Sequence, residues 1–473
     1  MSISGRLRNL GAQAPSWGLT PVPGDMRRLS GLDLAVLWGD LAVGILVLAA
    51  GALLVPALGL PQATLAIVLG SALGCIPLAL VGVAGAREGV PGMVLFRPIL
   101  GIRGSWIPSV MNLIQLVGWT ALELWAMARV ANGVSKDTFG FDAYPVWLVG
   151  IALLCTALAL GGPVLVVRKW LERFGVYVVA AVGLWLTWRL VTAVDLSDAW
   201  AQPGKGGWPN FSLGMDLVIA MPVSWLPLVA DYNRFAEGRR PSAVGTFFGF
   251  FLGNTWFFAL GAMLVLVAEA SPDAQGIGAA ITTLAGGVFL LLVLLVVESD
   301  EAFANIYSSA ISLQNLFPKV SQPTLILSVA GVGTLFAAFL SMNTYEYFLL
   351  LIGSVFVPLF GVFVARYFFL GDGGFEREAL FTRGGLYWFR GGFRWLSMLP
   401  WLVGFIVYQW SVPTGPEWWT GAVESIAGAV GLPSPLFGSA LGASIPSFAS
   451  AFGLSLLLGA LSRMRARTTQ RRG

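Results

Sequence analysis

Long apolar runs dominate this sequence, and they are separated by short polar segments. A helix crosses a hydrocarbon layer roughly 30 Å thick with about 20 residues, and the hydropathy pattern predicts twelve such spans. The runs show no strict alternation of polar and apolar residues, so the pattern predicts an all-α membrane protein and not a closed barrel. The predicted spans cover residues 33–56, 62–83, 106–131, 144–163, 174–194, 212–230, 242–268, 279–312, 323–341, 346–368, 395–411 and 437–461.

The basic residues are distributed unevenly between the loops. With the N-terminus inside, all but four of the 28 Lys and Arg residues lie on the cytoplasmic side; the four are Arg129, Lys136, Arg189 and Lys205. Because cytoplasmic loops hold the positive excess, we expect a multi-pass protein of the cell membrane with both termini cytoplasmic. The net charge of +4 is spread over many loops, so we expect no nucleic-acid partner.

Composition limits the chemistry further. The chain is 57% hydrophobic and 11% charged, which is more apolar material than one soluble core needs. It has no histidine, so a histidine-liganded metal site is excluded and a proton relay must use carboxylates. Cys75 and Cys155 both fall in predicted spans, where a disulfide is not expected. No removable signal is apparent at the polar, basic N-terminus, and we expect no cofactor.

Two of the predicted spans are interrupted. The first contains Trp38-Gly39-Asp40 followed by Gly44, and the sixth contains Pro222 and Pro227. Proline removes a backbone donor, and glycine lowers the cost of unwinding. Proline kinks are common in membrane helices, but two interrupted spans in equivalent positions, five spans apart, favour an inverted-repeat transporter with its binding site at mid-membrane.

This interpretation predicts how the chain is organised. We expect one membrane domain and no separate soluble domain. The predicted parts are an N-terminal cytoplasmic segment (1–30), a transport core (31–368) made of two five-helix repeats (31–200 and 205–368), a Gly- and Arg-rich cytoplasmic loop (369–394), two additional helices (395–461) and a basic cytoplasmic tail (462–473).

The eighth span contains charges that lipid disfavours. Each ionised residue near the bilayer centre costs roughly 2.5 to 3.5 kcal/mol, so Glu298, Asp300 and Glu301 require a polar cavity. At about 100° per residue, Glu298, Glu301 and Asn305 share one stripe of a helix, while Ser299 and Asp300 face the other side. The alternative is an exposed loop after residue 297, but the continued helical spacing of apolar residues favours a helix.

Two further acids fall in predicted spans. Asp40 lies beside the break in the first span, and Glu123 lies one turn beyond Trp119 in the third. A flat heterocycle needs a ring to stack on and an acceptor for its N–H groups, and Trp119 with Glu123 offers both. These residues therefore indicate a buried site for a small heterocyclic substrate.

Several short motifs occur in a distinctive order between about residues 30 and 410. They are Leu37-Trp38-Gly39, the segment from Arg97-Pro98 to Gly104, Gly118-Trp119, the segment from Pro222 to Pro227 running into Asp231-Tyr232-Asn233-Arg234, and Asn305-Ile306-Tyr307-Ser308 running into Gln314-Asn315. In these motifs the chain resembles the nucleobase-cation symporter family, which includes cytosine permeases and carriers of hydantoin, allantoin and hydroxymethylpyrimidine.

The resemblance implies a LeuT-type fold of two inverted five-helix repeats plus two C-terminal helices. The substrate would lie between spans one, three, six and eight. Trp119 matches a stacking tryptophan, Glu123 and Asn305 match residues that hydrogen-bond the base, and Gly44 replaces a side chain that is often polar. Some members place a second stacking tryptophan at Met221 or Pro222, and whether Trp225 replaces it here stays open. The implied substrate site comprises Trp119, Glu123, Gly44, Pro222, Trp225, Glu301 and Asn305.

The resemblance also implies a cation site between spans one and eight. It would comprise backbone carbonyls near Asp40 and Val43, the carbonyl of Val296, and the side chains of Ser299 and Asp300. Ser299 fits the family pattern. Asp300 departs from it, because a hydroxyl residue is usual there, and a carboxylate can bind Na⁺ or carry a proton. The coupling ion is therefore Na⁺ or H⁺.

Taken together, these residues predict a symporter that imports an aminated heterocycle, such as cytosine, a purine or hydroxymethylpyrimidine, by alternating access. An acid-rich site favours substrates with several donors and also permits a cationic amine. A polyamine or amino-acid carrier on the same fold is the alternative, although a substrate carboxylate favours a site with few acids. A membrane-embedded enzyme is a remote alternative, since no ligand-spaced motif accompanies the acids. The oligomeric state is left open, a monomer included.

Overall fold

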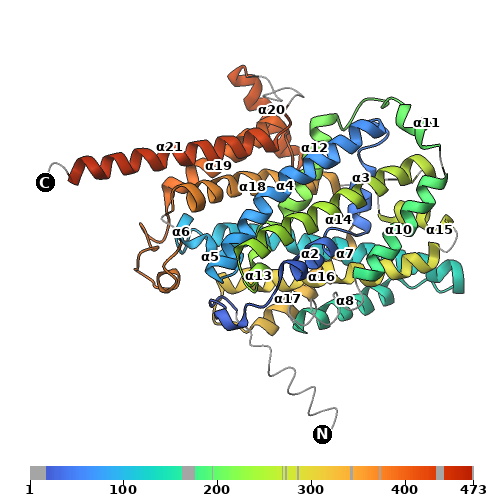
Figure 1. Ribbon diagram of the computed structural model, residues 1–473, viewed down its shortest axis with the longest axis horizontal. Helices are drawn as coiled ribbons and strands as arrows, with labels where there is room; N and C mark the ends of the chain where they lie inside the picture. Colours follow the sequence, from blue (N-terminus) through green and yellow to red (C-terminus); the bar gives the residue numbers. More distant parts are fainter. Residues whose placement is uncertain are drawn as a thin grey trace, which may run out of the picture.

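The computed structural model describes residues 18–161, 176–193, 195–268, 270–271, 274–284, 287–340, 345–371, 374–432 and 441–470. Within these ranges the regular secondary structure is helical, and β-structure is limited to two isolated bridges. The helices form one bundle, with α18, α19 and α21 packed together along one edge and α20 projecting from it (Figure 1).

The helices fall into three groups along the chain. The first group is η1 (Gly24–Met26), α2 (Gly31–Asp40), α3 (Ile45–Ala52), α4 (Leu60–Glu88), α5 (Gly92–Leu95), α6 (Arg97–Leu100), α7 (Trp106–Phe139), α8 (Tyr144–Gly161), α10 (Val176–Ala193) and α11 (Leu196–Ala201). The second is α12 (Phe211–Trp225), α13 (Val229–Asn233), α14 (Arg239–Ala268), α15 (Ala274–Thr283), α16 (Gly287–Leu316), α17 (Gln322–Phe339), α18 (Tyr345–Val364) and the π-helical turn η3 (Ala365–Phe369). The third is η4 (Glu378–Leu380), α19 (Trp395–Ser411), α20 (Glu417–Val430) and α21 (Ser444–Gln470).

Each of the twelve predicted spans coincides with a helix or a helix pair in the described part of the chain. Seven of these helices are long and apolar enough to cross a membrane, and the bent pair α2 and α3 forms an eighth span. The remaining spans are the shorter helices α10, α12 and α19 and the acid-bearing helix α16. The arrangement fits two five-helix repeats followed by two further spans, as predicted.

The boundaries differ from the prediction at two spans. The eighth was predicted to begin at residue 279, but α15 ends at Thr283 and α16 begins at Gly287. The alternative of a loop after residue 297 is wrong, because α16 continues to Leu316. The last helix begins at Ser444 and runs to Gln470, into the segment expected to be a tail, whereas residues 437–440 lie outside the described residues. Helix α20 was not predicted.

The first span breaks where glycine and aspartate interrupt the apolar run. Helix α2 begins with a capping box in which the Asp33 backbone N–H donates to Ser30 Oγ at 3.2 Å and the Ser30 N–H donates to Asp33 Oδ2 at 2.8 Å. It ends at Asp40, and α3 begins after Gly44, whose backbone is extended. The two halves are bent by 62°. The predicted interruption is therefore confirmed.

The sixth span also breaks, at its second proline. Helix α12 ends at Trp225 and α13 begins at Val229, with Pro227 between them. The carbonyl of Ser224 accepts a hydrogen bond from Gln115 Nε2 on α7 at 2.9 Å. A polar side chain from a neighbouring helix thus satisfies a backbone group near the broken end, as hydrocarbon requires.

A stripe of glycines lets α14 approach the broken first span closely. Gly245, Gly249 and Gly253 lie one turn apart, and a Cβ built on each would lie 2.4 to 2.5 Å from a backbone carbonyl oxygen of α2. Small residues at this spacing allow membrane helices to pack backbone against backbone. Further along α14, a Cβ on Gly261 would meet the backbone of α3. Helix α14 therefore packs against both halves of the broken first span.

At one end of the bundle, residues of the sequence motifs noted above are joined by buried hydrogen bonds. Arg97 Nε and Nη2 donate to Asn315 Oδ1 at 3.1 and 2.7 Å, and Asn315 Nδ2 donates to Ser105 Oγ and Ser109 Oγ. The side chain of Asp231 accepts from the backbone N–H of Gly92 at 2.9 Å. The bonds of Arg97 and Asn315 join α6, α7 and α16, and the Asp231–Gly92 bond joins α13 to α5, so these motif residues stabilise the fold.

Candidate functional site

A small cavity lies between α7, α12 and α16, near the middle of the bundle. Its volume is only about 10 Å³, and every lining residue is at most 6% exposed, so the cavity is occluded from solvent. The lining residues are Trp119, Glu123, Met221, Ser224, Trp225, Glu301 and Asn305.

Two tryptophans form the aromatic wall of this cavity. The Trp119 ring is held edge to face by Phe348 and Tyr345 of α18, with ring centroids 5.2 and 6.1 Å apart. Trp225 is held in the same way by Trp38 of α2, at 6.0 Å. Trp119 Nε1 finds no acceptor among the described residues. These aromatic contacts restrict the orientation of both rings, so each ring offers a rigid apolar surface to a ligand.

Three carboxylates meet beside the tryptophans. One oxygen from each of Glu123, Glu298 and Glu301 lies within 4.8 Å of the others, and all three residues are buried. The two ion pairs found in the described part of the chain are Arg87–Glu88 and Lys136–Asp142, so no described base neutralises this cluster. Two unit charges this close repel by at least ~3.5 kcal/mol at the effective dielectric of a protein site. The cluster therefore requires a proton or a cation.

Glu298 also caps the N-terminus of α3, the second half of the broken first span. Its Oε2 accepts a hydrogen bond from the backbone N–H of Ile45, the first residue of α3, at 2.8 Å. A carboxylate at this position satisfies one of the free donors of a helix N-terminus and favours its positive end. Gly44 makes the approach possible: a Cβ there would lie 2.8 and 2.9 Å from the Glu298 oxygens and 2.9 Å from Glu301 Oε1.

Two of the residues expected to hold the coupling cation, Asp40 and Val43, lie at this break. Asp40, at the end of α2, is 4% exposed and lies within electrostatic range of Asp300 and Glu298. The backbone N–H of Val43 donates to the Asp40 carbonyl at 3.1 Å. Ser299 and Asp300 are buried on α16. Val296 lies on the same helix, and its side chain is outside the described part of the chain.

Comparison with known proteins identifies the family of this chain. Residues 21–429 match the family model described as permease for cytosine/purines, uracil, thiamine and allantoin. The chain belongs to this permease family. It is 24% identical to the hydantoin permease of Microbacterium maritypicum over 407 residues, covering 80% of this chain and 81% of the relative. It is 27% identical to the cytosine permease of Escherichia coli strain K12 over 303 residues, covering 64% and 69%.

Solved structures show the same fold. The permease superposes with a TM-score of 0.79 on Mhp1, a nucleobase-cation-symport-1 family transporter, in a closed conformation with bromovinylhydantoin bound, at 20% identity over 95% of this chain and 96% of the other. It superposes with a TM-score of 0.64 on a Na⁺-coupled sialic acid symporter, at 12% identity over 97% and 96%. As a member of the family that its sequence matches, the protein is a multi-pass membrane permease for heterocycles and not an enzyme.

The permease brings together most of the residues expected to bind substrate. Trp119, Glu123, Trp225, Glu301 and Asn305 all line the cavity. Gly44 lies beside it, against the carboxylates of α16. The described cavity does not include Pro222; its ring packs on α4, 2.3 Å from a Cβ built at Gly74. Helix α12 runs through Pro222 to Trp225, so the break of this span lies beyond Pro222.

Two cavity residues and one cap were missed. Met221 and Ser224 line the cavity with Trp225, and their spacing of three and four residues on one helix face was a usable signal. Glu298 was recognised as a buried acid, but nothing in the sequence indicated that it caps α3, because its partner Ile45 is 253 positions away.

Proposed function

We propose that this permease is a cation-coupled symporter that imports an aminated heterocycle, of the size and chemistry of cytosine, a purine or hydroxymethylpyrimidine, by alternating access. The observation that carries the proposal is the occluded cavity in which two fixed tryptophan rings face two carboxylates and an amide. Relatives named for hydantoin, cytosine and allantoin support a heterocyclic substrate.

The lining of the cavity suits a flat ring that carries several N–H groups, and the cavity must widen to admit one. The ring stacks on Trp119, and Trp225 supplies a second aromatic wall. Glu123 and Glu301 are acceptors when ionised, and Asn305 both donates and accepts. A base with an exocyclic amine and a ring N–H can satisfy both carboxylates, whereas a base with more acceptors leaves buried carboxylate oxygens unpaired, which costs binding energy.

Coupling follows from the charge of the site. The three-carboxylate cluster needs a proton or a cation, and Asp40 and Asp300 lie next to it, at the break of the first span. Binding a cation or proton there lowers the repulsion on the remaining carboxylates. The ion is Na⁺ or H⁺. Either ion would favour the substrate-bound state, in which the carboxylates accept hydrogen bonds from the N–H groups of the substrate.

The proposal is tested by uptake into proteoliposomes. Labelled cytosine, adenine, uracil, an aminopyrimidine and a polyamine are each presented with an imposed Na⁺ gradient or an imposed H⁺ gradient. Accumulation of an aminated base under one gradient would identify substrate and ion together. Equal uptake with and without both gradients would show that the permease is not a symporter.

Two variants separate the substrate and cation functions. Asn305→Ala should abolish base uptake without reducing the amount of protein in the membrane. Asp300→Asn should change the dependence on the cation more than the ranking of substrates. If Asp300→Asn altered the ranking alone, the assignment of Asp300 to the cation would be wrong.

A polyamine carrier is the second candidate, because three buried carboxylates without a described base could also hold an ammonium group. Movement of the polyamine alone in the same assay would favour it. A flat base should then fail to compete.

A further inference from the structure

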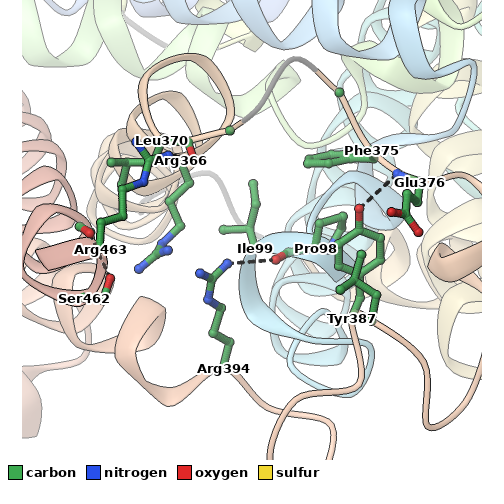
Figure 2. Close-up of a pocket in the computed structure, with 14 residues that line it drawn as sticks. Pro98, Ile99, Arg366, Leu370, Phe375, Glu376, Tyr387, Arg394, Ser462 and Arg463 are labelled. Atoms are coloured by element: carbon green, nitrogen blue, oxygen red, sulfur yellow. Dashed lines mark hydrogen bonds between the residues drawn. The ribbon is translucent and has the colours of Figure 1, made fainter. Parts of the chain in front are cut away.

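A second and larger cavity lies at one end of the bundle, away from the heterocycle site (Figure 2). Its volume is about 600 Å³, and its lining shares no residue with the small cavity. The walls come from α6, from the end of η3, from the connector between residues 374 and 394, and from α21. We call it the arginine pocket, after Arg366, Arg394 and Arg463 in its lining.

Arg366 enters this pocket without a counter-charge. The residue is 7% exposed, and its Nε and Nη2 are buried and find no hydrogen-bond acceptor among the described residues. Buried polar groups without partners are rare, and each costs free energy comparable to a lost hydrogen bond. A guanidinium that keeps two buried donors unused is therefore suited to an anionic ligand.

A second guanidinium faces the first. Figure 2 shows the Arg394 side chain pointing toward Arg366, and the two groups repel one another electrostatically. Arg394 Nη1 donates to the Pro98 carbonyl at 3.3 Å, and burial lowers the pKa of Arg394. Two like charges held together in a partly buried space are stabilised by an anion between them.

The rest of the lining is compatible with a bound anion. Arg463 of α21 donates to the carbonyl of Leu370 at the pocket wall. The one acid of the described lining is Glu376, which lies on the far side of the pocket from Arg366 and Arg394 in Figure 2. Three arginines against one glutamate leave the lining with an excess of positive charge.

The position of the pocket indicates where the anion comes from. Two candidate membrane spans, Tyr345–Phe369 and Ser444–Met464, end beside it, at Leu370 and Arg463. The pocket is therefore level with the end of the apolar layer, where phospholipid headgroups lie. Basic pockets between membrane helices bind acidic lipid headgroups.

We propose that the arginine pocket binds a phosphate group, presented either by an anionic phospholipid headgroup or by a soluble phosphate ester. Guanidinium groups match the geometry of phosphate oxygens, because each presents a planar fork of donors. A ligand held there ties the connector and α21 to α6. The neighbouring Arg97 joins α6 to α16 through Asn315. The occupied pocket therefore stabilises this end of the bundle without contacting the substrate.

The test measures thermal unfolding of the full-length protein in detergent. The ligands are phosphatidylglycerol, phosphatidylcholine as the zwitterionic control, and glycerol phosphate. We expect phosphatidylglycerol to raise the unfolding temperature and phosphatidylcholine to have no such effect. A rise with glycerol phosphate of the same size would identify the soluble ester as the source, and a rise with the lipid alone would identify the headgroup.

Variants decide whether the pocket is the site. Arg366→Gln and Arg394→Gln should each weaken the apparent affinity for the phosphate ligand about tenfold, as expected for the loss of charge-assisted hydrogen bonds. The matched control is Arg390→Gln, an exposed arginine of the same connector that does not line the pocket. Because phosphate salts stabilise proteins in general, only the difference between variants counts. Equal shifts in all three variants and the wild type would overturn the proposal.

One sequence neighbour is tested separately. Asp372 lies between the lining residues Gly371 and Gly374 but outside the described residues. Asp372→Asn should leave phosphate binding unchanged or stronger. Binding that appears only in Asp372→Asn would show that the chain supplies its own anion, and the proposal would be wrong. Transport by these variants tests the proposed function independently, since none of them alters the heterocycle cavity.

Discussion

Replacing Gly44 by alanine is the smallest change that tests the carboxylate cluster. The added Cβ would lie 2.8 and 2.9 Å from Glu298 Oε2 and Oε1, and 2.9 Å from Glu301 Oε1. The backbone of Gly44 is extended, with φ of −175°, so alanine adopts it without strain. The added methyl group therefore acts by displacing the carboxylate oxygens of Glu298 and Glu301.

The structure sets the size of the effect. A methyl carbon this close forces each oxygen back by about 0.5 Å to reach ordinary contact. The hydrogen bond from the Ile45 N–H to Glu298 Oε2, now 2.8 Å, then lengthens or breaks. Hydrogen bonds to charged groups contribute about 1.5 to 3 kcal/mol, and each 1.4 kcal/mol is about tenfold in an equilibrium constant. We expect uptake efficiency to fall at least about tenfold.

The assay is initial-rate uptake of the preferred base into proteoliposomes, together with thermal unfolding of the purified protein. Gly150→Ala is the matched control, because nothing lies within 4 Å of a Cβ at that helical glycine. The unfolding temperature of Gly44→Ala should stay close to that of the control, since only side-chain ends have to move. Wild-type uptake by Gly44→Ala would refute the placement of Glu298 and Glu301 against the break.

Three further predictions address the cavity wall and the frame. Trp119→Ala should abolish base uptake while Trp119→Phe keeps part of it, because stacking depends on an aromatic face; full uptake by the alanine variant would exclude stacking there. Asn315→Ala removes the acceptor for two donors of buried Arg97 and should destabilise the protein by about 1 to 3 kcal/mol or more, seen as a lower unfolding temperature. Gly249→Leu should prevent α14 from meeting α2 and greatly reduce folded protein, whereas Gly331→Ala, with open space around its Cβ, should not; equal yields would show that close packing there is not needed.

The parts of the fold that the sequence could predict are those set by local chemistry. Apolar runs of spanning length identified each membrane helix, and glycine or proline marked both broken spans. On α16 the period of 3.6 residues separated Glu301 and Asn305 from Asp300, and the structure places the first two in the cavity. A periodic helix fixes which side chains share a face, whatever the helix packs against.

Contacts between distant helices could not be predicted in the same way. Pro222 was expected in the substrate site because the resemblance implies a second stacking residue there, but α12 continues through Pro222 and the proline ring faces α4. The cap from Glu298 to Ile45 and the glycine stripe of α14 depend on which helices become neighbours. Helix α20 was missed because the spans were recognised by their length, and its 14 residues are too few to cross a membrane.

Helix α16 explains why substrate and cation should influence one another under the proposed function. Glu301 lies in the heterocycle cavity, and one turn earlier Glu298 holds the start of α3 while repelling Glu301. A proton or cation that neutralises part of this cluster removes ~3.5 kcal/mol or more of repulsion per pair, and the substrate's N–H donors act on the same charges. Because such coupling is reciprocal, the cation should raise substrate affinity by the same factor by which the substrate raises cation affinity. A binding measurement at two cation concentrations would show it, even without a membrane.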